Sequence, residues 1–80
     1  MRSSTYSNEY AALRAWLKTK REEKGLSLRE VGELVGRHHS VIGKMEQDRR
    51  KIDIVEFVEY CHALEIDAAD GIAIISQTLK

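Results

Sequence analysis

Two short helical segments in the middle of the chain are joined by a connection too brief for an ordinary helical hairpin. The first opens with "LSLREV" and ends at "LVGRH", and the second follows at once with "HHSVIGKMEQ". Gly36 stands where a chain leaving one helix needs a left-handed residue before it turns into the next. Gly32, four residues earlier, leaves space for the second helix to cross closely. The spacing predicts helix–turn–helix geometry. Its inner face would consist of Val31, Val35, Ile42 and Met45.

Two of the predicted helices begin with a complete capping signature. Ser27 is followed three residues later by Glu30, so each side chain can accept a hydrogen bond from the other residue's backbone amide. Asp53 and Glu56 repeat this arrangement in "IDIVEF". Both starts are flanked by apolar residues at the positions of a hydrophobic staple, namely Leu26 with Val31 and Ile52 with Phe57.

Apolar residues recur at helical spacing along the chain, and no sustained alternation or Asn-Gly or Asp-Gly turn indicates strands. Helices are predicted over residues 8–24, after Ser27, over about residues 38–47, from Asp53 to about Leu64, and after Asp67. The expected fold class is all-α, a compact five-helix bundle, with a flexible tail at residues 1–7 and one domain at residues 8–80. The predicted inward residues of the fourth helix are Ile54, Phe57, Val58, Cys61 and Leu64.

The composition suits one soluble domain, since 42% of the 80 residues are apolar and 32% are charged. Cys61 is the only cysteine, which excludes an internal disulfide and a four-thiolate zinc site. On the fourth helix it falls on the apolar stripe, as a small hydrophobic residue does. The longest uncharged run, "GIAIISQTL", is too short to cross a bilayer, and the first residues lack the apolar region of a secretory signal. We expect a cytoplasmic protein with no membrane partner.

The neutral net charge hides an asymmetry between the two parts of the chain. Residues 1–51 carry 12 Lys and Arg against 7 Asp and Glu, a net charge of +5, whereas residues 52–80 carry one Lys against 6 Asp and Glu, a net charge of −5. Such polarity could orient the molecule on a polyanion such as nucleic acid. Alternatively, the two parts neutralise each other in the folded chain.

The adjacent residues His38 and His39 raise the question of a metal site. Neighbours on a helix point about 100° apart, so they cannot chelate one ion as an i, i+4 pair does. Ser40, beside His39, lacks the orienting carboxylate and the oxyanion hole that a nucleophile–base pair requires. We expect no metal, no cofactor and no enzymatic activity.

The stretch "LKTKREEKGLSLREVGELVGRHHSVIGKMEQDRR" resembles the Cro and phage-repressor type of helix-turn-helix protein, also called the XRE family. The resemblance continues through "IDIVEFVEYCHALEID" and covers residues 13 to about 67. It implies a lambda-repressor-like DNA-binding domain that inserts its third helix in the major groove of a palindromic operator. The implied function is sequence-specific binding of double-stranded DNA by a small transcriptional regulator, a repressor of bacterial or prophage origin.

The resemblance assigns roles to individual residues of this chain. The positions that meet base edges are His39, Ser40, Gly43 and Lys44, with Gly43 allowing a close approach. The positions near phosphates are Ser27, Arg29, Arg37, His38, Arg49 and Arg50. Three residues depart from the family pattern: Leu28 replaces a polar side chain that contacts a phosphate, Arg37 replaces an apolar or small polar residue, and His38 replaces the Ser or Thr that usually caps the third helix.

Two further expectations concern packing and assembly. The resemblance places Arg21 and Glu46 together beneath the third helix as a partly buried, bidentate ion pair. On the fifth helix, Ile72, Ile75 and Leu79 can face the core while Ile74 projects sideways. A homodimer through these four residues would cover them and place two third helices about 34 Å apart, one turn of DNA.

A second class of function remains open at this level. The chain could be a helical protein-interaction or antitoxin-type module that keeps the fold without reading DNA. The neutral net charge and Leu28 leave this alternative open, whereas the basic stretch at residues 44–51 favours DNA binding.

Overall fold

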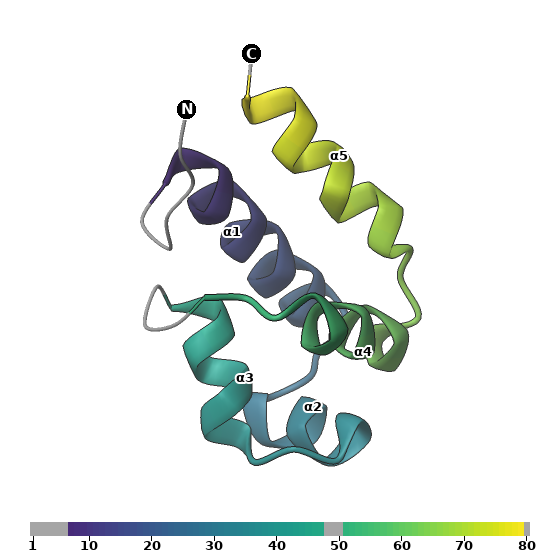
Figure 1. Cartoon of the computed structure of the whole chain (residues 1–80). Coiled ribbons are helices and arrows are strands. Elements are labelled where there is room, and N and C mark those ends of the chain that lie inside the picture. Colours follow the sequence, from purple (N-terminus) through teal and green to yellow (C-terminus); the bar gives the residue numbers. More distant parts are fainter. Residues whose placement is uncertain (1–6, 48–50, 80) are drawn as a thin grey trace.

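The computed structural model describes residues 7–47 and 51–79, which form five α-helices and contain no strand (Figure 1). The helices are α1 (Asn8–Glu23), α2 (Leu28–Val35), α3 (His39–Glu46), α4 (Ile54–Leu64) and α5 (Ala68–Thr78). The predicted all-α, five-helix fold is therefore confirmed. The tail predicted for residues 1–7 lies outside the described residues except for Ser7, whose hydroxyl accepts a hydrogen bond from the Tyr10 amide at 3.3 Å and caps α1.

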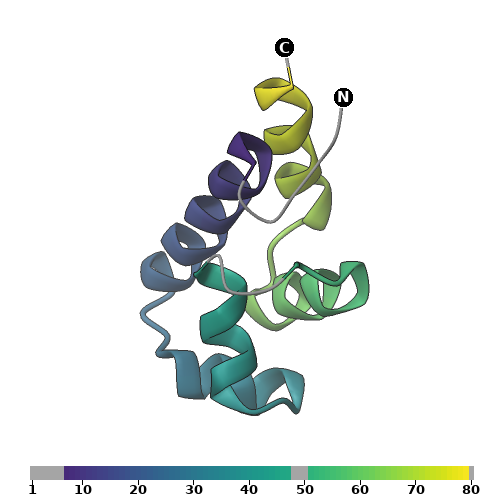
Figure 2. The same cartoon turned by 60° about the vertical axis from the view of Figure 1, so that its left-hand side comes forward.

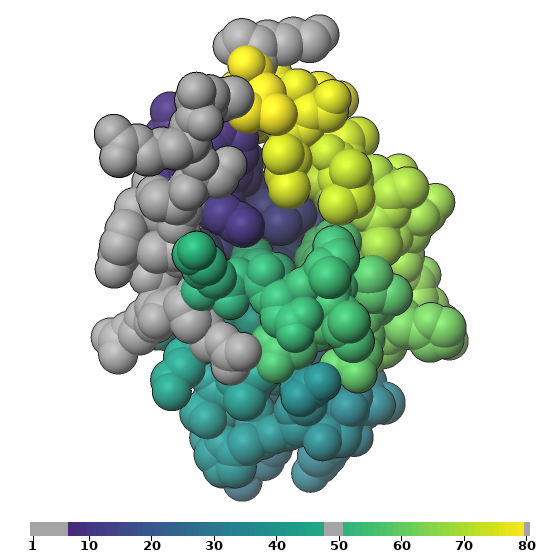
Figure 3. Space-filling view, viewed as in Figure 1, coloured from purple at the N-terminus to yellow at the C-terminus, as the bar shows by residue number. Residues whose placement is uncertain are grey.

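Two pairs of helices lie at opposite ends of the molecule. α1 and α5 run side by side and form one end, and α2 and α3 form the other end (Figures 1 and 2). The surface of α4 lies at the centre of one face, between α5 above and the α2–α3 pair below (Figure 3). Within the described part of the chain, no helix is long and apolar enough to cross a membrane.

The capping residues read from the sequence are in place, although Asp53 accepts from the Val55 amide and not, as its predicted capping box requires, from the Glu56 amide. The Ser27 hydroxyl accepts from the Glu30 amide at 3.1 Å, and the Glu30 carboxylate accepts from the Ser27 amide at 2.8 Å, which completes a capping box. Asp53 and Asp67 cap α4 and α5 through bonds of 2.9 Å from the amides two residues further on. Each bond satisfies an amide that has no partner within its own helix.

The turn between α2 and α3 has the geometry that the two glycines predict. Gly36 adopts a left-handed conformation, with φ of 75° and ψ of 29°, and the Arg37 amide donates to the Gly32 carbonyl at 2.9 Å. A Cβ atom at Gly32 would lie 2.7 Å from the Arg37 carbonyl oxygen and 3.1 Å from the His39 amide nitrogen. A side chain at position 32 would therefore push α3 away from α2.

The core lies where α1, α4 and the α2–α3 pair meet. It is formed by Leu13, Leu17, Val31, Ile42, Met45, Phe57, Tyr60, Cys61 and Leu64. Trp16 packs against this cluster, and its ring centroid lies 6.4 Å from that of Phe57. The indole ring is therefore part of the core and is not an exposed surface on which a nucleic-acid base would stack. Burial raises the pKa of the Cys61 thiol to about 11, so this cysteine stays protonated and unreactive at neutral pH.

The predicted inward face of α4 is wrong at two positions. Ile54 is 62% exposed and Val58 is 46% exposed, whereas Tyr60 is fully buried. The buried residues at positions 57, 60, 61 and 64 follow a single stripe of the helix, and Val58 lies about 100° away from it. Ile54 lies in the first turn, where the neighbouring helices no longer cover the side chain.

The predicted inward face of α5 is also partly wrong. A Cβ atom at Gly71 would lie 2.8 Å from Phe57 and 2.9 Å from Trp16, so α5 docks on the core through this glycine. Ile75, one turn further on, packs against the core. The other two residues predicted to face the core are exposed, Ile72 by 47% and Leu79 by 45%. Ile74, which was predicted to project sideways, is half-buried.

Candidate nucleic-acid interface

The outer face of α3 carries polar side chains, and its inner face is anchored in the core. Ile42 and Met45 are buried, while Ser40 and Lys44 are exposed and His39 is half-buried. These three polar side chains open onto one hollow, which is lined by Leu28, His39, Ser40, Gly43, Lys44 and Gln47. The structure thus brings the residues assigned to base reading together on one surface.

Gly43 lies at the base of this hollow. The residue is buried, and a Cβ atom placed on it would lie 3.6 Å from Cδ1 of Leu28. The leucine side chain therefore lies beside the glycine, because the two residues face each other across the contact between α2 and α3. Gly43 forms the floor of the hollow and not its open rim.

His38 has a structural task at the start of α3. Its Nδ1 accepts a hydrogen bond from the Ser40 amide at 3.1 Å and lies 2.9 Å from the Ser40 hydroxyl oxygen. The imidazole thus caps α3 where Ser or Thr is usual. Because the cap residue has an extended backbone, with φ of −63° and ψ of 144°, its ring lies only 4.2 Å from that of His39. The two imidazole rings therefore do not point about 100° apart, as neighbouring side chains within a helix do, because His38 precedes α3.

Metal ligands do not gather around this histidine pair. Among residues 7–47 and 51–79, no group of three or more His, Cys, Asp or Glu side chains is placed to hold a metal ion.

Arg37 is directed towards α4 and not to the outer face of α3. Its Nε donates to Glu59 at 2.8 Å, and a terminal nitrogen of its guanidinium lies 3.6 Å from Glu56. The hydrogen bond to Glu59 raises the pKa of Arg37 above its ordinary value. The turn thus places Arg37 opposite two carboxylates, and the phosphate contact inferred for this residue stays a prediction.

The other residues assigned to phosphates fall into two groups. Ser27 and Arg29 are exposed at the start of α2, although the capping box already occupies the Ser27 amide. Arg49 and Arg50 lie outside the described residues.

A buried polar cluster supports α3 from beneath. Arg21 donates to both carboxylate oxygens of Glu46, through Nε at 2.7 Å and through a terminal nitrogen at 3.0 Å, and also to the Leu26 carbonyl at 2.8 Å. The Arg21 side chain is 12% exposed and that of Glu46 is 5% exposed, so the bidentate pair has the geometry expected for it. Their hydrogen bond raises the pKa of Arg21.

Tyr60 joins this cluster from α4. Its hydroxyl donates to Glu46 at 2.5 Å and lies 3.2 Å from the Leu17 carbonyl oxygen. Burial, followed by the hydrogen bond to Glu46, raises the pKa of Tyr60 far above its ordinary value. The C-terminal end of α3 is thus tied to α1 and α4 through one carboxylate.

Arg14 supports the candidate interface from within the fold, a role that the sequence analysis did not predict. It is 4% exposed, and its Nη1 donates to the carbonyls of Lys44 at 3.1 Å, Met45 at 2.5 Å and Gln47 at 3.0 Å. The last carbonyls of a helix have no partner within the helix, and a cation is favourable beside them. Arg14 therefore holds the end of α3 in place. The sequence offers one indication of this role, because Arg14 lies on the apolar side of α1 with Leu13 and Leu17. A charged side chain that is buried there requires hydrogen-bonding partners.

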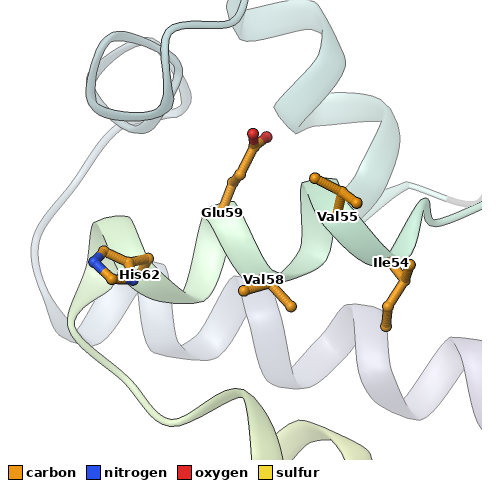
Figure 4. A pocket seen from close by; sticks show the side chains of 5 residues that line it. All are labelled: Ile54, Val55, Val58, Glu59 and His62. Carbon is orange, nitrogen blue, oxygen red and sulfur yellow. The ribbon is translucent and has the colours of Figure 1, made fainter.

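A second surface, on the outer side of α4, is apolar and open. Ile54, Val55 and Val58 are between 46% and 62% exposed, and they line a shallow hollow together with Glu59 and His62. Ile54 and Val58 project from one side of α4, while Glu59 projects from the other (Figure 4). This surface is separate from the hollow on α3.

Comparison with known proteins places these features in a family. The sequence pattern of a helix-turn-helix domain family matches residues 12–70. No curated protein sequence matches the chain. An XRE-family like protein from Pseudomonas syringae pv. tomato str. DC3000 has a similar structure, with a TM-score of 0.81 and 25% identity, over 90% of this chain and 88% of that chain.

Two crystal structures of the clp gene regulator ClgR from Corynebacterium glutamicum are also similar. Both have a TM-score of 0.78 and are 26% identical to this chain. One match covers 90% of this chain and 77% of that chain, and the other covers 92% and 95%. Since the family match spans most of the residues, the chain belongs to the helix-turn-helix domain family, and its resemblance to the XRE type is confirmed.

Proposed function

We propose that this protein binds double-stranded DNA in a sequence-specific manner and regulates transcription, with α3 lying in the major groove. The observation that carries the proposal is the hollow on α3, where His39, Ser40 and Lys44 share one face while Ile42 and Met45 anchor the other. A helix fixed in this way presents hydrogen-bonding groups at a defined distance from the body, as groove reading requires.

Each polar residue of the hollow suits a different atom of a base edge. Lys44 can donate to O6 and N7 of guanine, and His39 can donate to or accept from a purine edge. Ser40 can do either, so it discriminates weakly. Positioning on the backbone would come from Arg29, from the Ser27 hydroxyl hydrogen, and from Arg49 and Arg50 in the adjoining basic segment.

We also propose that the protein acts as a homodimer on a palindromic operator, as a repressor. The support comes from α5, where Ile72 is 47% exposed, Leu79 is 45% exposed and Ile74 is only half-buried. A twofold contact through these residues would cover them and would set two copies of α3 about one DNA turn apart.

The test is a fluorescence-anisotropy titration of labelled genomic duplexes at 50 mM and 200 mM salt. Contacts with phosphates release counterions, so we expect the affinity to fall by at least about tenfold between the two conditions. An acidic control protein of the same size should show no binding at either salt concentration. Absence of binding at 50 mM salt to all fragments would refute the proposal.

One observation favours the alternative of a protein-interaction module. The apolar side chains of Ile54, Val55 and Val58 are exposed on α4, away from the hollow on α3. Such a module would bind no duplex in the titration, and its function would depend on the α4 residues instead. Substitution of Val58 by Asp would then abolish function in cells, whereas substitution of Lys44 by Ala would not.

A further inference from the structure

The floor of the hollow on α3 is apolar, although its rim is polar. Leu28 extends from the first residue of α2 over the main chain of Gly43, with Cδ1 at contact distance from where a Cβ of residue 43 would stand. The side chains of His39, Ser40, Lys44 and Gln47 complete the lining. Leu28 is half-buried, so one part of its side chain packs on the core and another part remains open to the hollow.

This combination of groups restricts what the hollow can recognise. The rim residues can bond to the polar atoms of base edges, but Leu28 has no hydrogen-bonding group to offer either a base or a phosphate. The major groove displays one apolar group, the 5-methyl group of thymine, which apolar side chains contact. The same group occurs on 5-methylcytosine. A hollow with an apolar floor and polar walls therefore matches a methylated pyrimidine edge.

We propose that Leu28 and Gly43 form a contact site for the 5-methyl group of a pyrimidine, and that Leu28 is a specificity-determining residue. The inference rests on the proposed function, because it requires α3 to lie in the major groove. Gly43 contributes by its lack of a side chain, which leaves the space above the leucine methyl open. Leu28 thus reads sequence, whereas a polar residue at this position would hold the backbone.

The chain offers two variants that alter the site in different ways. Leu28→Gln replaces the two methyl groups with a polar amide at the end of a side chain that is one atom longer. Gly43→Ala fills the hollow, and its Cβ would meet Leu28 at 3.6 Å, an ordinary contact distance that requires no shift. Alanine also favours the helix over glycine, so this variant retains the fold.

Leu34→Gln is the matched control. Leu34 lies on the same helix as Leu28 and is 59% exposed, but it does not line the hollow. The control therefore makes the same chemical change on α2 away from the proposed site.

The experiment uses a duplex that the wild-type protein selects from a random pool. Each thymine is replaced in turn by deoxyuridine, which removes only the methyl group, and each cytosine is replaced by 5-methylcytosine, which adds it. Dissociation constants are measured by anisotropy for the wild type and the three variants. These two sets of duplexes distinguish thymine from 5-methylcytosine as the source of the methyl group.

At one pyrimidine position, we expect the methyl group to tighten binding by the wild type about threefold to fivefold, the effect of burying one methyl group. The preference should disappear in Leu28→Gln and in Gly43→Ala and persist in Leu34→Gln. Changes below about 1.5-fold at every position in the wild type, or a preference that survives in Leu28→Gln, would overturn the inference and leave the proposed function intact. If no duplex is selected from the pool, both the proposed function and this inference fail.

Discussion

Substitution of Arg14 by Met tests how α3 is held in place. Arg14 is 4% exposed, and its Nη1 lies within 3.1 Å of three carbonyl oxygens at the end of α3. This nitrogen carries two hydrogens, so three acceptors share two charge-assisted bonds, each worth about 1.5–3 kcal/mol. The favourable placement of a cation at a helix C-terminus adds roughly 0.3–1 kcal/mol. We therefore expect Arg14→Met to lower the free energy of unfolding by about 3–7 kcal/mol.

The assay is urea unfolding followed by circular dichroism and by the fluorescence of Trp16. The matched control is Lys18→Met, which removes an exposed cation from the same helix and should change the free energy by less than about 0.5 kcal/mol. Arg14→Lys keeps the positive charge but has fewer hydrogen-bond donors. Its loss of unfolding free energy should lie between the losses in Arg14→Met and Lys18→Met. If Arg14→Met unfolds within about 0.5 kcal/mol of the wild type, the helix end does not depend on this residue, and the reasoning is refuted.

Three further predictions concern the buried cluster, the pH dependence and the assembly. Glu46→Gln should destabilise the fold by roughly 3–5 kcal/mol in urea unfolding, because it leaves the Arg21 cation buried without its anionic partner; a free energy of unfolding within about 0.5 kcal/mol of the wild type would contradict this. Burial raises the pKa values of Cys61 and Tyr60 above their values in the unfolded chain. Stability should therefore be fully present below about pH 9 and should decrease as the pH rises through 11, while a flat profile in this range would refute the assignment. Ile72→Glu should convert a dimer to a monomer in analytical ultracentrifugation at tens of micromolar, and a wild type that is already monomeric with and without DNA would exclude the proposed dimer.

The helix starts and the turn could be predicted from the sequence because they depend on neighbours along the chain. The capping box at Ser27 and the left-handed Gly36 involve residues no more than four positions apart, and both are present in the structure. The buried and exposed faces of α4 and α5 depended instead on which helices cover them. Ile54 and Ile72 were predicted to face the core, and the packing of helices distant in the sequence leaves both exposed.

The candidate site shows the same division between local and distant causes. Helical periodicity, combined with the family resemblance, placed Ser40 and Lys44 on one face of α3, and the structure has them there. The attachment of Arg14 to the end of α3 spans about thirty residues, and no local pattern indicates its partners. The family resemblance assigned Arg37 to a phosphate, and it could not indicate the carboxylates that bind this residue, which lie on α4.

The central claim is that the exposed face of α3 reads DNA sequence, and the most direct measurement compares the binding preferences of alanine variants on this face. Wild type, Lys44→Ala, His39→Ala and the control Lys18→Ala would each select from one random duplex pool, followed by titration of the preferred duplex. Lys44→Ala should lose about 1–3 kcal/mol of binding free energy on that duplex and relax its preference at one or two base pairs. Lys18→Ala should select the same sequence as the wild type. If His39→Ala and Lys44→Ala both keep the affinity and the sequence preference of the wild type, α3 is not the reading element.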